Sequence, residues 1–359
     1  MQAIEAFLIL AALYALGDFV GTKSKAWIPS VFVVACLFLV GYWTFFPKDI
    51  VALAGMGAPL GGTLAILFCI THMGTIISVK ELLAQWKIIV ITLLGLTGMV
   101  LFGWFICVPL VGKAYVVAGL PPLSGGIVAA VMMQQAAAAK GLETASVLAI
   151  AMYVMQGFAG YPLTAILLKK EGKNLLKKYR SGEAVVVKSV AVESENGKLA
   201  TKESGKKKLI PPVPDKYNTT ALILAKLASI GTLAYLVQKC TGGVLNMAVV
   251  ALILSVIATE LGYLDKDSLH KAGSFGFLMF VLMIYIFSGL AKATPAMLAT
   301  IAGPMVVIIV VGVIGMVIFA LIAGKLLHIP PGSVLLPGFV HHLNRSTPPA
   351  VPRRRPPYP

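Results

Sequence analysis

The residues of this chain best suited to chemistry are hydroxyl and amide side chains within or beside long apolar runs. Carboxylates are nearly absent from those runs: Asp18 and Glu260 lie near the ends of two of them, where capping or extended side chains explain them. A proton relay through a membrane needs carboxylates at depth, so oxygen ligands for a hard cation such as sodium are the better prediction. The candidate ion-binding residues are Thr71, Thr75, Thr144 and Ser146. For each, a hydrogen bond within or between membrane helices is the alternative.

A candidate anion site lies in residues 119–140, where Gly-Leu-Pro-Pro-Leu-Ser-Gly-Gly precedes an alanine-rich apolar run. A helix that begins within a bilayer leaves its first amides unpaired and directs its positive end at whatever lies there. Such breaks survive only against protein or a water-filled cavity, and secondary transporters build substrate sites from them. The predicted substrate-binding residues are Ser124, Gly125, Gly126, Gln134 and Gln135. A surface loop followed by an ordinary helix is the alternative for this stretch.

The composition of the chain indicates a polytopic membrane protein. Of its 359 residues, 58% are hydrophobic and 12% charged, and the mean hydropathy is +0.90, whereas soluble domains are nearer a quarter charged. The net charge of +16 comes mostly from loops, so membrane topology explains it better than nucleic-acid binding. No nucleophile with a positioned base, phosphate-binding loop or metal-ligand spacing of cysteines occurs, so neither an enzyme nor a cofactor is expected.

The expected fold is all-α, with nine membrane spans and one segment that enters the membrane without crossing it. The spans are predicted at residues 4–21, 28–46, 60–79, 88–111, 144–168, 219–238, 244–262, 272–290 and 298–324. Lysines cluster after the first, third and fifth spans, which assigns those loops to the cytoplasm and the N-terminus to the outside. This pattern holds only if residues 117–141 form a re-entrant hairpin. The predicted location is the inner (plasma) membrane.

The second half of the chain repeats the first at a constant offset, since Gly95 and Gly98 return as Gly312 and Gly315 (312 − 95 = 315 − 98 = 217). An odd number of spans in the first half makes the second half inverted, as in many secondary transporters. The expected units are a first repeat at 1–168, a disordered basic cytoplasmic linker at 169–216 and an incomplete second repeat at 217–333. A Pro- and Arg-rich tail at 334–359 follows.

The tail loses all membrane character just where a second hairpin is expected to begin with Pro330-Pro331-Gly332-Ser333. We interpret the sequence after Ser333 as truncated or out of frame. Codons for 338–346 read one base on could encode a hairpin-like sequence. Sequencing of the locus tests this hypothesis, which fails if the shifted frame holds no apolar span.

Several short motifs, taken in order, resemble the bacterial sodium/glutamate symporter family. They are Ile28-Pro29, the Thr-His-Met-Gly-Thr-Ile-Ile of 71–77, the Leu-Ser-Gly-Gly of 123–126 and the Gly-Phe-Ala-Gly-Tyr-Pro of 157–162. The resemblance covers most of residues 1–330 and departs from the family after Gly126, where Ile127 and Val128 stand. It implies two inverted five-helix repeats, sodium as coupling ion, an anionic small-molecule substrate such as an amino acid or carboxylate, and elevator-like movement.

Other functions remain open on the sequence alone. A non-transporting remnant, a pore-like membrane protein and a carrier of the same architecture for another solute all fit the same pattern of spans. Besides sodium and substrate, the expected partners are membrane lipid and a second copy of the chain, since many carriers of this kind are dimers. A sodium-dependent flux separates these alternatives.

Overall fold

The computed structural model describes residues 2–24, 27–180, 209–211 and 213–327, and within them the regular secondary structure is entirely helical. The first half contains α1 (Ala3–Lys23), α2 (Ser30–Thr44), α3 (Ile50–Leu53), the π-helix η1 (Ala58–Ala65), α4 (Ile66–Ile76), α5 (Val79–Ala84), α6 (Trp86–Phe102), the π-helix η2 (Gly103–Cys107), α7 (Val108–Val111), α8 (Lys113–Ala139) and α9 (Glu143–Arg180). The second half contains η3 (Asp215–Tyr217), α10 (Thr220–Cys240), α11 (Met247–Leu261), α12 (Ser268–Lys271), α13 (Phe275–Ser288), the 3₁₀-helix η4 (Gly289–Lys292) and α14 (Pro295–Leu326).

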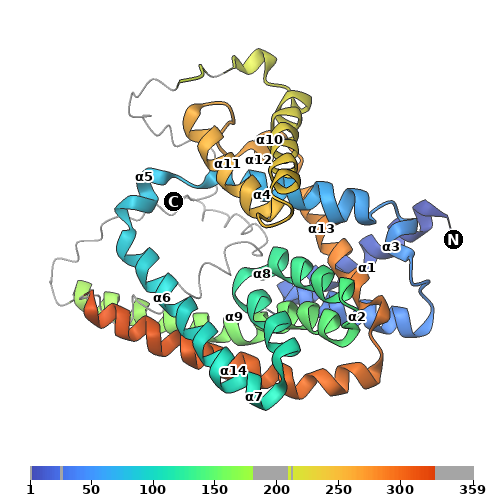
Figure 1. The fold of residues 1–359 in the computed structure, drawn as a ribbon, viewed down its shortest axis with the longest axis vertical. Coiled ribbons are helices and arrows are strands. Elements are labelled where there is room, and N and C mark those ends of the chain that lie inside the picture. Colours follow the sequence, from blue (N-terminus) through green and yellow to red (C-terminus); the bar gives the residue numbers. More distant parts are fainter. Residues whose placement is uncertain (1, 25–26, 181–208, 212, 328–359) are drawn as a thin grey trace, which may run out of the picture.

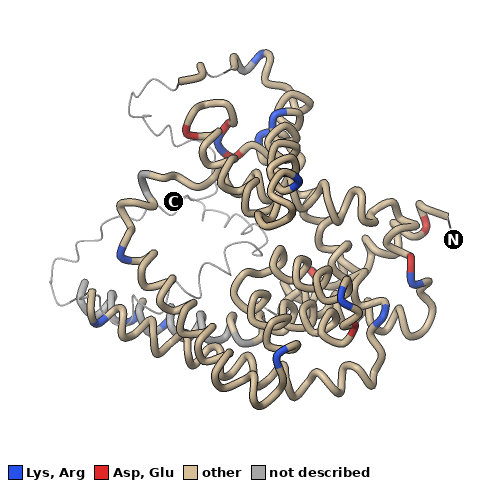
Figure 2. Tube along the Cα trace, in the orientation of Figure 1, with Lys and Arg blue, Asp and Glu red and all other residues tan. Residues whose placement is uncertain are grey.

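The long helices are apolar along their length, and two of them begin at a capping threonine. Seven helical segments in the described chain are long and apolar enough to cross a membrane. Thr219 accepts a hydrogen bond from the Leu222 amide at the start of α10, and Thr294 caps α14 in the same way. Figure 2 shows charged residues mainly at helix ends and in loops, with long uncharged stretches between them. The multi-pass membrane protein expected from composition therefore has the helices it needs.

Each predicted span coincides with a helix or with consecutive helical segments, but the linker was predicted to begin too early. Helix α9 continues to Arg180 because the predicted linker opens with lysine and leucine, which favour helix. At the other end, the Ile210 amide donates to the Leu261 carbonyl, and η3 follows. The rest of the linker, at 181–208, and the expected second hairpin and tail, from 328 onward, lie outside the described residues.

Helix α8 does not run straight, because it folds back at Gly126. The dihedral angles of Gly126 are φ 67° and ψ −147°, which interrupt the helix. Ala118 and Ala137 belong to one buried cluster with Ala145, although a straight helix would hold the two alanines about 28 Å apart. Figure 1 shows α8 packed as short coils beside α9 and not as one long rod.

The contacts of α8 with α9 give the direction of its two parts. Before the break, Gly119 lies beside Met152, and Gln156 reaches the carbonyls of Pro122 and Leu123, so this part runs parallel to α9. After the break, Ser146 bonds to the Gln134 carbonyl and Leu142 to that of Ala137, so the second part runs antiparallel. The two parts of α8 are therefore antiparallel to each other.

Helices α6 and α14 lie against each other (Figure 1). They run antiparallel, and small residues line their contact. A Cβ on Gly98 would lie 2.5 Å from the Gly315 carbonyl oxygen, and one on Gly315 would lie 2.7 Å from that of Gly98. Glycine at both positions lets the backbones meet. The ring of Phe102 packs edge to face against that of Phe319, with centroids 6.3 Å apart. Both pairs are related by the offset of the sequence repeat (315 − 98 = 319 − 102).

Buried positions in the other helices follow the same offset. Ala6 and Leu10 of α1 correspond to Ile223 and Leu227 of α10, and all four are buried. The pairing of α1 with α2 has its counterpart in the pairing of α10 with α11. Three of the four buried residues of α2 have buried counterparts in α11: Val34 and Ala251, Phe38 and Ser255, and Gly41 and Ala258. The fourth, Ala35, corresponds to Leu252, which is not fully buried.

Candidate functional site

The amide side chain of Gln134 lies at the centre of a polar cluster between α8, α9 and η4. The Ser146 hydroxyl donates to the Gln134 backbone carbonyl over 3.1 Å, which joins the second part of α8 to the start of α9. The Gln134 amide nitrogen lies directly against Gly289, where α13 changes to the 3₁₀ geometry of η4. A side chain at position 289 would overlap both Gln134 and Ile150. Glycine at 289 is therefore what admits the amide.

Gln135, the next residue, joins a second group at the same place. Its amide nitrogen donates to the Tyr285 hydroxyl over 3.3 Å. The Tyr285 side chain in turn lies on Gly61 and Gly62 of η1: a Cβ on Gly62 would come 2.6 Å from the Tyr285 hydroxyl oxygen. Short π-helical segments are frequent at functional sites. The structure thus brings the predicted residues Gln134, Gln135 and Ser146 together with Tyr285.

The break that precedes this cluster is held by a side chain from α9. The carbonyls of Pro122 and Leu123 come just before Gly126, where the helix can no longer supply their partners. With its amide nitrogen turned toward them, Gln156 donates to these two carbonyls over 2.8 Å and 3.0 Å. The Ser124 hydroxyl donates to the Pro121 carbonyl over 3.3 Å. Gly125 is exposed next to the break.

The four predicted ion-binding residues do not form one site. The Thr75 hydroxyl donates to the His72 carbonyl over 2.6 Å, and the Thr71 hydroxyl to the Leu67 carbonyl over 2.8 Å, so both bond to their own helix. Thr75 lies near α12, where it accepts from the Ser268 amide. Thr144 and Ser146 lie at the start of α9, beside the Lys292 end of η4.

The separation of these two pairs follows from the length of α13 and η4. His72, which lies one helical turn before Thr75, packs its ring against Phe275 at the start of α13, with centroids 5.1 Å apart. Lys292 at the other end bonds to Glu143, next to Thr144. The helical rise over residues 275–292 puts these ends roughly 25 Å apart. The four predicted residues therefore lie in two separate places, because sequence spacing says little about which helix ends meet.

A third cluster, formed by His72, Asp267 and His270, has the residue types of a metal site. The ligand atoms of the three residues lie within 4.8 Å of one another. However, the Leu269 amide donates to Nδ1 of the His72 ring over 3.2 Å, which puts the proton of the neutral ring on Nε2. Nε2 faces the Asp267 carboxylate at 3.6 Å. A metal at Nε2 would have to displace that proton, which would leave the ring as an anionic imidazolate because Nδ1 accepts a hydrogen bond and carries no proton. The cluster therefore fits a contact between α4 and α12 better than a metal centre.

Sequence reasoning missed Tyr285, Gly289 and Gln156. All three lie far in sequence from the residues they contact, so no local motif indicates them. Tyr285 lies within the continuous apolar run of α13, and Gly289 follows that helix. Gln156 is an isolated polar residue within the apolar first part of α9. An isolated polar residue in a membrane span is the one signal that could have found Gln156.

Comparison with known proteins does not extend this description. No family model matches the chain, and no curated protein matches it. The resemblance to the sodium/glutamate symporter family therefore stays a prediction from its short sequence motifs.

Proposed function

We propose that this chain is a sodium-coupled secondary transporter of a small organic anion, working by elevator-like alternating access in the inner membrane. The observation that carries the proposal is the fold-back of α8 at Gly126, with Gln134 and Gln135 about two helical turns after it and Tyr285 bonded to Gln135. Helices broken at membrane depth, with polar groups gathered at the break, are how such carriers hold substrate. The fold-back is the re-entrant hairpin of the proposal.

The depth of the break supports this reading. Leu123, just before Gly126, packs against Gly312, near the middle of α14. Val128, just after it, packs against a buried cluster that includes Ile70 and Ala251 of α4 and α11. The tip of the fold-back thus lies beside the middle of long apolar helices, where water is available only inside a protein cavity.

The pairing of helix ends supports a segment that enters and leaves on one side. Trp43 donates to the Ala293 carbonyl, and the Val79 amide bonds to Glu260. If α8 crossed the membrane, every helix after it would run in the opposite direction. Trp43 and Ala293 would then lie on opposite sides of the membrane, and so would Val79 and Glu260. The observed pairs give only which helix ends share a side. The lysine positions then assign the sides in the proposal, with an outer N-terminus and a cytoplasmic basic linker at 169–216.

The reciprocal contact of Gly98 with Gly315, at the offset of the sequence repeat, supports two halves related by a pseudo-two-fold axis. Antiparallel packing of α6 and α14 is the arrangement that an inverted repeat requires. In the proposed carrier, one half reproduces the other in the opposite orientation, so the same fold can open to either face of the membrane.

The polar cluster supplies the chemistry. Lys292, at the end of η4, bonds to Glu143. In the proposal the substrate anion is therefore held by the Gln134 and Gln135 amides and the Tyr285 hydroxyl, and the helix end at 124–126, about two turns away, contributes its positive dipole. Ser146 donates its hydroxyl proton to the Gln134 carbonyl, which leaves its oxygen lone pairs for a cation. Sodium therefore binds in the proposal near Ser146 and Thr144, next to the substrate, and Thr71 and Thr75 serve packing.

Uptake into proteoliposomes tests the proposal. Radiolabelled glutamate, aspartate and citrate are presented with an inward sodium gradient, with equal sodium on both sides, and with choline in place of sodium. The proposal expects one of these anions to accumulate only under the sodium gradient. Sodium-independent leak would identify a pore, and folded protein without flux of any anion in the panel would overturn a carrier function.

A further inference from the structure

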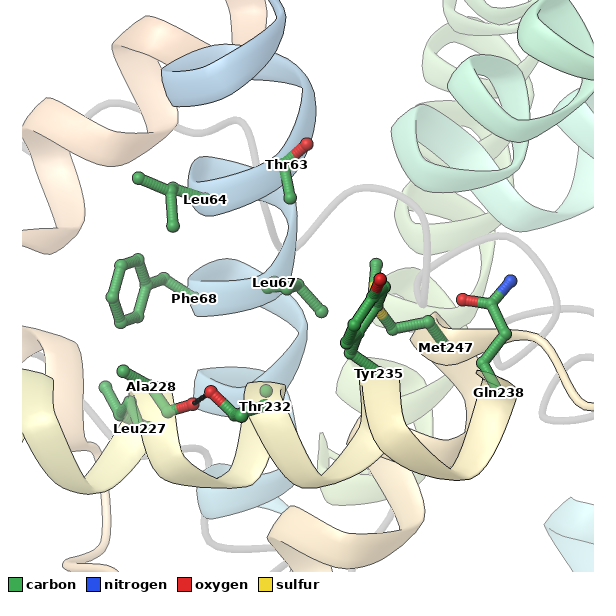
Figure 3. Close-up of a pocket in the computed structure, with 11 residues that line it drawn as sticks. Thr63, Leu64, Leu67, Phe68, Leu227, Ala228, Thr232, Tyr235, Gln238 and Met247 are labelled. Atoms are coloured by element: carbon green, nitrogen blue, oxygen red, sulfur yellow. Dashed lines mark hydrogen bonds between the residues drawn. The ribbon is translucent and has the colours of Figure 1, made fainter. Parts of the chain in front are cut away.

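A cavity of about 430 Å³ lies in the corner between η1, α4 and α10 (Figure 3). Its walls are mostly apolar: Leu67 and Phe68 come from α4, and Leu227 and Ala228 from α10. Polar atoms come from Thr63 and from Thr232, Tyr235 and Gln238 of α10, and the Thr232 hydroxyl donates to the Ala228 carbonyl. The volume is within the range of ligand pockets, and no lining side chain is charged.

The repeat offset explains why the cavity exists. Position 231 on α10 corresponds to 14 on α1 (14 + 217), and position 63 corresponds to 280 (63 + 217). In the mirrored corner, the rings of Tyr14 and Phe280 pack edge to face, with centroids 5.4 Å apart and planes at 88°. In the corner with the cavity, these places are held by Gly231 and Thr63. One half of the protein thus fills its corner with two aromatic rings, and the other half leaves it open.

The two corners are otherwise built alike. Leu10 and Leu227 occupy corresponding positions and are both buried, with exposures of 0% and 1%. Gly231 has only the Leu67 side chain within 4 Å of where its Cβ would be, the nearest atom at 3.5 Å. The missing volume is therefore that of an apolar, ring-sized or chain-like group. Because Thr63, Leu64 and Tyr235, which line it, are exposed, the corner is open to its surroundings.

We infer that this corner binds one acyl chain of a membrane lipid, with the lipid's polar end at Tyr235 and Gln238. Tyr235 is 53% exposed and lies one turn before Lys239, at the end of α10. Tyrosine followed by lysine at a helix end is typical of the level of lipid head groups. In Figure 3, Tyr235 and Gln238 lie together on one side of the corner, away from Leu227 and Phe68. This inference rests on the proposed membrane topology and is independent of transport.

Photolabelling tests the inference without any measurement of flux. The purified protein is reconstituted in nanodiscs with phosphatidylethanolamine that carries a diazirine in one acyl chain, irradiated, digested and analysed by mass spectrometry. We expect adducts concentrated on residues 227–238 and 63–68, at least five-fold above those on the mirrored corner of α1 and α13. The filled corner is an internal control that needs no variant. Equal labelling of the two corners would overturn the inference.

Two variants sharpen the test. Gly231→Tyr places at 231 the side chain that Tyr14 provides in the mirrored corner. We expect this variant to lower labelling of residues 227–238 at least five-fold. Leu233→Tyr is the matched control, because it adds the same side chain to α10 at a position that is 46% exposed, and it is expected to leave labelling unchanged. Thr63→Phe fills the corner from the opposite wall if Gly231→Tyr does not fold. If Gly231→Tyr or Thr63→Phe folds and residues 227–238 are labelled as strongly as in the wild type, the inference is wrong.

Discussion

The backbone carbonyl of Gly98 occupies space that a side chain at position 315 would need, and the carbonyl of Gly315 does the same for a side chain at position 98. A Cβ on Gly98 would lie 2.5 Å from both the Gly315 carbonyl oxygen and the Phe319 ring, and a Cβ on Gly315 would meet the Gly98 carbonyl and Phe102 at 2.7 Å. The partners in each pair stand 217 residues apart (315 − 98 = 319 − 102 = 217). A reciprocal contact of this kind is what a two-fold axis between the helices produces.

Alanine at either glycine is expected to destabilise the protein by a similar amount. Because the added Cβ meets backbone and not the end of a flexible side chain, the helices must move apart, and overpacking of this kind costs about 1–3 kcal/mol. Thermal unfolding in detergent measures the loss for Gly98→Ala and Gly315→Ala. Gly303→Ala is the control on α14, since nothing lies within 4 Å of its added Cβ. Strongly unequal losses at 98 and 315 would argue against the symmetric contact.

Introduced cysteines at 117 and 142 are expected to react from the same face of the membrane. Val117 and Leu142 lie before and after the fold-back and are 42% and 44% exposed. The native cysteines are first replaced, since Cys240 is exposed. A membrane-impermeant maleimide applied to cells and to inverted vesicles measures the sidedness. Reaction of the two positions from opposite faces would mean that α8 crosses, and both the inverted arrangement and the carrier proposal would fail.

Substitutions in the polar cluster are expected to lower sodium-driven uptake without unfolding the protein. Gly289→Ala displaces the Gln134 amide, and Tyr285→Phe removes the hydroxyl to which Gln135 donates. A neutral hydrogen bond contributes about 1 kcal/mol, so Tyr285→Phe should lower apparent substrate affinity roughly five-fold. Tyr217→Phe, at the exposed tyrosine of η3, is the control. Unchanged uptake by both cluster variants, at normal unfolding temperature, would exclude Gln134 and Gln135 as substrate ligands.

The positions of the helices could be predicted from the sequence, because length and apolar composition determine where a chain can span a bilayer. The break at Gly126 was also predictable, since Pro121, Pro122 and paired glycines have few other uses in an apolar run. The continuation of α9 to Arg180 was not, because lysine-rich sequence is compatible with both a helix and a solvated linker.

Most of the site could not be predicted, because it depends on which helices meet. Gln134 and Gln135 were accessible to sequence reasoning as polar residues behind a break, but the approach of Tyr285 depends on Gly61 and Gly62, in the opposite half of the chain. Thr71 and Thr75 have the composition of ion ligands, yet their hydroxyls bond to their own helix. Hydroxyl side chains in helices have that local alternative everywhere.

The backbone of Asp267 lies in the left-handed region, with φ 57°. Two substitutions of Asp267 are expected to distinguish the free-energy cost of backbone strain from the cost of losing the carboxylate charge. Asparagine tolerates this region, whereas a β-branched residue is strained there by about 1–2 kcal/mol. Asp267→Val should therefore lower the unfolding free energy by that amount more than Asp267→Asn does. Denaturation monitored by tryptophan fluorescence measures both. Equal losses would show that the carboxylate beside His72 and His270, and not the backbone, stabilises the loop.

Glu143 and Lys292 join the start of α9 to the end of η4, and this link is expected to depend on pH. The hydrogen bond from the Lys292 ammonium, and then its charge, lower the pKa of Glu143 below its ordinary value of 4.5. A carboxyl whose pKa is lower in the folded state stabilises the protein above pH 4.5, and that contribution disappears as the pH falls through the folded-state pKa. Unfolding temperatures of wild type and Lys292→Met should differ by a small, constant amount above pH 4.5 and converge below it. Because both side chains are exposed, added salt should shrink the difference. A difference that persists unchanged after Glu143 is fully protonated would show that Lys292 acts through packing and not through its bond to Glu143.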